Sequence, residues 1–133
     1  MSFELSESYL TGVRHLDDDH RELVARINAI DELERAKNNT ALVGALLEFK
    51  KHFVEHFRRE EADLKRVKYP KLNSHTKHHS ETIVALERLI RSVECGEQNA
   101  DSVAGRCFHE LIAAVILQDM QFLNWLADHP ELK

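Results

Sequence analysis

The sequence predicts an all-α protein, an up-down-up-down four-helix bundle preceded by an N-terminal arm. Three observations support this fold class: apolar residues recur at spacings of three and four, the alternation typical of β-strands is absent, and only four glycines and two prolines interrupt the chain. At 133 residues, the chain is large enough to bury a core without disulfides or structural zinc. We therefore expect a single domain over residues 1–133.

Breaks in the apolar pattern give the expected element boundaries. Residues 1–16 carry scattered apolar side chains, and we expect them to form an arm across the bundle. Asp19 and Glu22 stand at capping-box spacing, which predicts a helix start near residue 18. Tyr69 and Pro70 separate the second and third helices, because proline suits a first helical turn. The expected helices cover about 18–37, 41–65, 71–95 and 102–128. The last turn is expected at Gly96, Gln98, Asn99 and Asp101.

Composition excludes several classes of protein. The net charge of -5 and the isoelectric point near 6.0 argue against a nucleic-acid binder, which concentrates Lys and Arg for phosphate contacts. The longest apolar run, Leu111 to Leu117, is far shorter than the ~20 residues that span a bilayer, and we expect no membrane insertion. Without a signal region, the chain is expected to be cytoplasmic, with Cys95 and Cys107 as free thiols.

The second helix carries a histidine and a carboxylate on its apolar face. Its stripe consists of Leu42, Leu46, Phe49, Phe53, His56, Glu60 and Leu64. A buried carboxylate without a partner costs several kcal/mol. A positive group is therefore expected to meet Glu60 in the core.

The other helices carry similar polar residues on their inner faces: His20 on the first, His75 and His79 on the third, and Asp119 on the fourth. At ~1.5 Å per residue, His20 and His56 lie ~28 and ~24 Å from the first turn. By the same measure, His79 and Asp119 lie ~27 and ~28 Å from the last turn. All these groups can therefore meet in one layer of the bundle.

This layer predicts a dinuclear metal site. Imidazole and carboxylate together suit iron, manganese or zinc, and carboxylates on different helices can each bridge two metals. Each residue also has an ordinary interpretation, such as a hydrogen-bonded core histidine, an i, i+4 pair between His56 and Glu60, or an interhelical hydrogen bond from Asp119. The coincidence of six residues on four faces at one depth favours the metal site. The predicted ligands are His20, His56, Glu60, His75, His79 and Asp119. The remaining histidines at His15, His52, His78 and His109 are expected to be structural or solvated.

The chain resembles the hemerythrin family over nearly its whole length, and four segments carry the resemblance. They are LDDDHREL around His20, HFRREE around His56, YPKLNSHTKHH through His79, and AVILQDMQFLNWL around Asp119. The resemblance implies two non-heme irons with an oxo or hydroxo bridge in a four-helix bundle that binds dioxygen. It also implies roles for the six residues: His20 and His56 on one iron, His75 and His79 on the other, and Glu60 and Asp119 as bridges.

The chain departs from the family pattern on the fourth helix, where a histidine, four residues and an aspartate are expected. With Asp119 as the aspartate, Ala114 occupies the position of the fifth histidine. A register that uses His129 instead places it ~15 Å past the metal layer, and we reject it. We therefore expect one iron position without a protein ligand, which water or a small anion fills. We also expect a shortened lifetime of the oxygenated form.

The resemblance leaves three functions open. The first is an oxygen or redox sensor that binds dioxygen and controls an output domain beyond residue 133, with a diguanylate cyclase as the specific expectation. The second is a stand-alone oxygen carrier or store. The third is a di-iron oxidase or peroxidase, for which the sequence offers no additional acid or base group. A metal-free structural bundle is the remaining alternative, and iron content distinguishes it from the others.

Overall fold

The computed structural model describes residues 3–97 and 102–132, and its long elements are all helices. They are α1 (Arg14–Arg35), α2 (Asn39–Arg66), α3 (Leu72–Glu94), α4 (Val103–Arg106) and α5 (Ala113–Ala127). A π-helical segment, Cys107–Ile112, joins α4 to α5, and short 3-10 turns occupy Glu7–Tyr9 and Pro130–Leu132. No strand occurs in these described residues, which confirms the all-α prediction. Of the turn expected before the fourth helix, Gln98, Asn99 and Asp101 lie outside the described residues.

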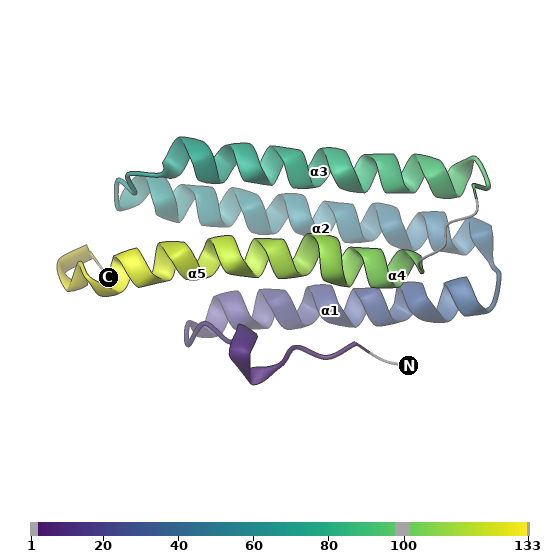
Figure 1. The fold of residues 1–133 in the computed structure, drawn as a ribbon, viewed down its shortest axis with the longest axis horizontal. Coiled ribbons are helices and arrows are strands. Elements are labelled where there is room, and N and C mark those ends of the chain that lie inside the picture. Colours follow the sequence, from purple (N-terminus) through teal and green to yellow (C-terminus); the bar gives the residue numbers. More distant parts are fainter. Residues whose placement is uncertain (1–2, 98–101, 133) are drawn as a thin grey trace.

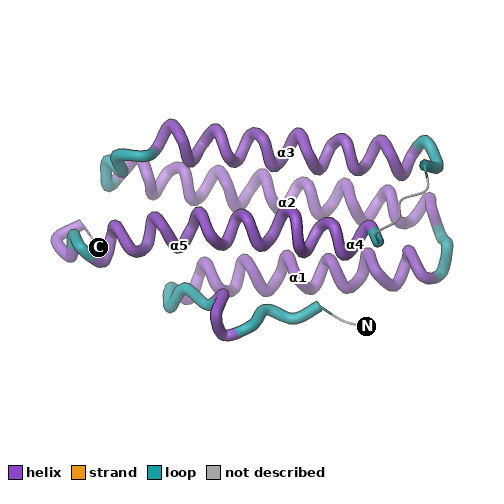
Figure 2. The backbone as a smooth tube through the Cα atoms, in the orientation of Figure 1, coloured by secondary structure: helices purple, strands orange, loops and turns teal. Residues whose placement is uncertain are grey.

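The four helical segments α1, α2, α3 and α4–α5 lie side by side with nearly parallel axes (Figure 1). The α1–α2 connection lies at one end of the molecule and the α2–α3 connection at the other, and loops are confined to the ends and the arm (Figure 2). The arm runs beside α1, where the backbone of Phe3 exchanges two hydrogen bonds with the Asn28 side chain at 2.7 and 2.9 Å. The Phe3 ring also stacks on Phe108 with centroids 5.1 Å apart.

The first helix begins four residues earlier than the predicted start at residue 18, and the expected capping box is wrong. Val13 is the N-cap residue, and Asp17 lies inside the first helical turns. The Asp17 carboxylate reaches back to accept hydrogen bonds from Thr11 N and Oγ1, both at 2.8 Å, and from Gly12 N at 3.2 Å. Asp17 therefore binds the arm to the helix. The sequence does not distinguish this role from capping, because both place a carboxylate near the start of a helix.

The π-helical segment changes which residues of the fourth helical segment face the core. The helical spacing around Asp119 also predicts an inner face at Gly105, Phe108, Ile112, Val115 and Phe122. However, Ala104 and Cys107 are fully buried, and Phe108 is half-buried. A π-turn adds one residue to the helical repeat, so the buried line moves by one position before Ile112. After the segment, Val115, Asp119 and Phe122 are buried as predicted. Both cysteines are free, as expected.

Two hydrophobic clusters enclose a polar layer. The larger cluster contains Ile27, Leu46, Phe49, Phe53 and Leu86 among its buried members. The smaller cluster lies toward the α2–α3 connection and consists of the buried residues Leu64, Val67, Tyr69 and Phe122. The predicted ligands occupy the helix positions between these clusters, so apolar side chains lie on both sides of them.

We expect Asp17→Ala to lower the free energy of unfolding by about 1–2 kcal/mol, because three donors lose their shared acceptor. Burial raises the pKa of Asp17, but hydrogen bonds from Thr11 and Gly12 outweigh it and leave that pKa lowered from 3.8. The stabilisation is therefore present above pH 3.8 and is lost as pH falls through the folded pKa. Urea denaturation of the variant and the wild type at pH 7 and pH 3 measures both effects.

The matched control for this experiment is Asp18→Ala, because Asp18 is exposed and makes only surface pairs, with Arg14 at 3.9 Å and Arg21 at 3.2 Å, which solvent screens. Its effect should stay within about 0.5 kcal/mol. Equal losses in the two variants would contradict the role assigned to Asp17.

Candidate metal centre

The six side chains predicted as ligands meet in one buried layer. His20 comes from α1, His56 and Glu60 from α2, His75 and His79 from α3, and Asp119 from α5. None is more than 3% exposed. Long hydrophobic stripes bring these positions inward, because each residue takes a place in the helical repeat that otherwise holds Leu, Ile or Phe.

One half of the layer is built around His20 and His56. The Nε2 atom of His20 lies 2.9 Å from Asp119 Oδ2, and Nε2 of His56 lies 3.4 Å from the same oxygen. These three residues place ligand atoms within 4.8 Å of one another. This half therefore offers two imidazole nitrogens and a carboxylate oxygen to a single metal ion.

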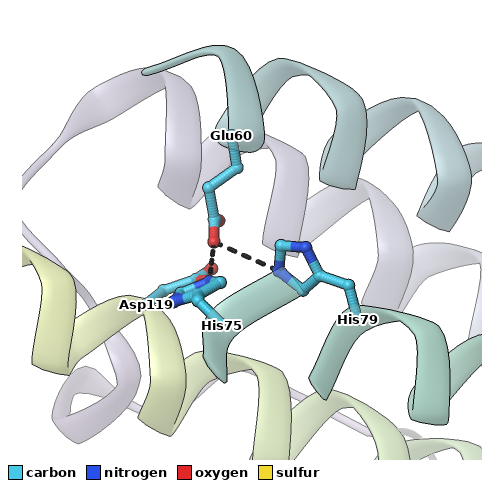
Figure 3. Close-up of side chains that lie close together, drawn as sticks. All are labelled: Glu60, His75, His79 and Asp119. Carbon is cyan, nitrogen blue, oxygen red and sulfur yellow. Dashed lines mark hydrogen bonds and ion pairs between the residues drawn. The ribbon is translucent and has the colours of Figure 1, made fainter. Parts of the chain in front are cut away.

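The other half is built around His75 and His79, which point toward Glu60 and Asp119 (Figure 3). Glu60 Oε1 forms a short contact with His75 Nε2 and lies 3.3 Å from His79 Nε2. Asp119 Oδ1 lies 3.7 Å from His75 Nε2. This half offers two nitrogens and two carboxylate oxygens within 4.8 Å of one another.

Both carboxylates face the two halves at once. Glu60 directs Oε1 toward His75 and His79, and its Oε2 lies 3.3 Å from His56 Nε2. Asp119 directs Oδ2 toward His20 and His56 and Oδ1 toward His75. Each carboxylate thus has one oxygen for each histidine pair, which is what a bridging ligand between two metals requires.

Several polar atoms of the layer are buried without a hydrogen-bond partner among the described residues. They include His56 Nε2, Glu60 Oε2, His79 Nε2 and Asp119 Oδ1. Buried polar atoms are normally satisfied, and carboxylate oxygens and imidazole nitrogens are the ligands that iron, manganese and zinc accept. The residues present therefore fit a pair of metal ions, which would satisfy these atoms together.

Without a metal, the layer balances its charge by protonation. Burial lowers the pKa of His56, but the carboxylates of Asp119, Asp19 and Glu60 outweigh it and raise the pKa to about 11. Burial likewise lowers the pKa of His75, and Asp119 and Glu60 raise it to about 9. Burial raises the pKa of Glu60, yet the three nearby histidines hold it well below 4.5. A metal ion must displace such protons, because it binds the unprotonated nitrogens.

Aromatic residues form the wall of the layer next to His79. The Phe57 ring stacks on His79 with centroids 3.8 Å apart and planes within 9°. Tyr69 contacts the edge of His75 with centroids 6.2 Å apart. A groove of about 430 Å³ between α2 and α3 reaches Phe57 and His79 from outside. The stacked pair therefore separates the polar layer from solvent on this side.

The remaining histidines stand apart from the layer. His15 and His109 are exposed, and His52 and His78 are half-buried. His129 stacks on Trp125 with centroids 4.2 Å apart, and its Nδ1 lies 2.8 Å from the Trp125 carbonyl oxygen. None of them belongs to a potential metal-binding group among the described residues.

The sequence patterns missed two carboxylates that stand behind the histidines. Asp19 Oδ2 lies 2.9 Å from His56 Nδ1, and Glu61 Oε2 lies 3.8 Å from His79 Nδ1. Asp19 was assigned to capping instead. The available signal was the position of both acids next to a predicted ligand, Asp19 before His20 and Glu61 after Glu60.

Helices that enclose a layer of four imidazoles and two shared carboxylates define a cation-binding helical protein. The particular family follows from comparison with family models: the hemerythrin HHE cation-binding domain matches residues 11–131. The chain belongs to the hemerythrin family. Comparison with curated protein sequences and with solved structures gave no match. Among the described residues, no helix combines the length and apolarity that a membrane crossing requires.

The metal-free protein should be most stable between about pH 4.5 and 6.5. The stabilisation from His56 and His75 is complete below their unfolded pKa of 6.5 and is lost as pH rises toward about 11 and about 9. The contribution of Glu60 is present above 4.5 and is lost as pH falls. Chemical denaturation of chelator-treated protein across this range measures the profile. Stability that rises steadily from pH 6.5 to 9 would contradict the assignment.

Proposed function

We propose that the layer holds two non-heme irons. His20 and His56 bind one iron, His75 and His79 bind the other, and Glu60 and Asp119 bridge them together with an oxo or hydroxo group. The observation that carries this proposal is the division of each carboxylate between the two histidine pairs, one oxygen to each. We also propose that successive helices run in alternating directions, an up-down-up-down topology, in which ligands converge from all four helical segments.

The bound irons would supply reversible dioxygen binding and one-electron redox chemistry. The chain supplies the remainder: four imidazoles that hold the ions and two carboxylates that fix their separation. The hydrophobic clusters on either side separate the layer from bulk solvent. A dry environment strengthens the interaction between the carboxylates and the cations, because the local dielectric constant is low.

Ala114 is the proposed position of a missing histidine ligand. It is half-buried and lies at the start of α5. Four residues separate it from Asp119, as four residues separate the histidine from the aspartate in the family pattern. Its methyl group offers no ligand atom. We propose that the iron held by His75 and His79 therefore keeps an additional exchangeable position, which water or a small anion occupies.

We further propose that the domain is a cytoplasmic oxygen or redox sensor. Because the ligands come from α1, α2, α3 and α5, a change in iron state acts on all four helical segments at once. Such a change can bias helix packing and reach an output domain beyond residue 133, for which a diguanylate cyclase is our specific proposal. The exchangeable position at Ala114 favours sensing over long-term oxygen storage. The apolar surroundings of the layer suit a stand-alone carrier equally well, which makes the carrier the alternative function.

Anaerobic loading with ferrous iron should give two irons per chain, with charge-transfer absorption of a bridged pair after oxidation. Iron analysis combined with absorption spectroscopy measures this. Asp119→Ala should lose at least one iron, because the shared oxygens serve both halves. The matched control is Asp128→Ala, which changes an exposed aspartate at the C-cap of α5. Full iron content in the Asp119 variant would contradict the proposed site.

The substitution Ala114→His should slow the autoxidation of the reduced protein, because it fills the exchangeable position. The rate is measured by absorption after air is admitted to the ferrous protein. Ala113→His, at the neighbouring position, is the control. An unchanged rate in Ala114→His would overturn the assignment of Ala114. A wild-type protein that stays oxygenated for hours would favour a carrier over a sensor.

A further inference from the structure

Asp19 joins two side chains of α2 at the back of the metal layer. Its Oδ2 atom lies 2.9 Å from Nδ1 of His56 and 2.9 Å from Nη2 of Arg59. His56 is 1% exposed, whereas the Asp19 side chain is 26% exposed and the Arg59 side chain 59%. The three residues form a chain of contacts from solvent to a buried imidazole whose other nitrogen faces the carboxylates.

The histidines of the layer differ in how the rear nitrogen is held. His56 Nδ1 has a carboxylate at hydrogen-bonding distance. By contrast, Nδ1 of His20 and Nδ1 of His79 are buried and have no hydrogen-bond partner in the part of the chain that the structure describes. The nearest carboxylate to His79 Nδ1 is Glu61, at 3.8 Å, which is too far for a hydrogen bond. Among His20, His56 and His79, the rear hydrogen bond to a carboxylate is therefore specific to His56.

We propose that Asp19 is a positioning residue that holds His56 as the Nδ1–H tautomer and thereby presents the Nε2 lone pair to one metal. This inference rests on the proposed two-metal site. A neutral imidazole carries its proton on one nitrogen only, and the hydrogen bond to the rear nitrogen decides which one. A carboxylate in this place also makes the imidazole a stronger donor to a metal.

Arg59 completes the arrangement by holding the acceptor. The guanidinium donates to the same Asp19 oxygen, which fixes the carboxylate against α2 although Asp19 belongs to α1. Because Arg59 is largely exposed, its contribution is screened by solvent and should be smaller than that of Asp19. The order of effects is therefore Asp19 first and Arg59 second.

The inference predicts an unequal effect on the two metals. Asp19→Ala should weaken one of two cobalt(II)-binding steps by about 10–100-fold and leave the other unchanged. Asp19→Asn should lose less, because an amide oxygen still accepts from Nδ1–H without the charge. Arg59→Gln should weaken this step less than Asp19→Asn does. Cobalt(II) titration of the chelator-treated protein, followed by visible absorption in competition with a chelator of known affinity, resolves the two steps.

The matched control is Asp18→Asn, which removes the same charge from the adjacent residue. Asp18 is exposed and pairs with Arg14 and Arg21 at 3.9 and 3.2 Å, away from the histidines. Both binding steps should be unchanged in this variant. A loss equal to that of Asp19→Asn would show that net charge, and not the contact with His56, is responsible.

A second readout follows the tautomer itself. In the zinc-loaded protein, nitrogen-15 NMR of the histidine rings should show His56 protonated at Nδ1, and this proton should become exchange-broadened in Asp19→Ala. Asp19→Glu should restore part of the signal and part of the affinity. If Asp19 only held α1 against α2, Asp19→Glu would not change the nitrogen-15 signals of the His56 ring.

The possible outcomes separate this inference from the proposed function. A wild-type chain that binds fewer than two cobalt ions contradicts the two-metal site itself. Two ions in the wild type with unchanged binding in Asp19→Ala and Asp19→Asn overturn the role of Asp19 alone. Equal weakening of both steps also overturns it, because the contact then acts on the bundle as a whole. If Asp19→Ala does not fold, as judged by circular dichroism, Asp19→Asn decides between these outcomes.

Discussion

Burial of two carboxylates among four imidazoles is the constraint on which the rest of this structure depends. Glu60 and Asp119 are at most 2% exposed, and an ionised carboxylate in such a place is tolerated only with cationic or hydrogen-bonding partners. The partners are four histidines on α1, α2 and α3, which the bundle must bring to one level. Helix lengths, apolar stripes and connections at opposite ends serve this alignment, since a shift of one helical turn would separate the groups by ~5.4 Å.

The site could be predicted from the sequence because its residues violate a strong pattern. His56 and Glu60 stand where the repeat of α2 otherwise holds Leu and Phe, and the same holds for His75, His79 and Asp119. Hydrophobic periodicity identifies the buried face, and helical rise gives the depth of each residue along it. Together they bring the six groups to one layer without knowledge of a single contact. The all-α class follows from the same periodicity.

Other features could not be predicted, because they depend on choices that the pattern does not distinguish. Asp17 and Asp19 are both acids near a helix start, yet one binds the arm and the other binds a histidine on another helix. The π-helical segment was missed since Phe108 and Cys107 are both apolar, and either could face the core. Local propensity is weak where two alternatives of similar free energy exist, and tertiary contacts then decide.

The unequal sizes of the two hydrophobic clusters have a consequence for assembly of the centre. Among residues 3–97 and 102–132, twenty buried residues form the larger cluster, whereas only four form the smaller one beyond the polar layer. Local opening requires less free energy where fewer apolar contacts are broken, so the end that contains Tyr69 and Phe122 frays first. An incoming ion can therefore reach the histidines by transient separation of the helix ends, while the larger cluster keeps the chain folded around a half-formed site.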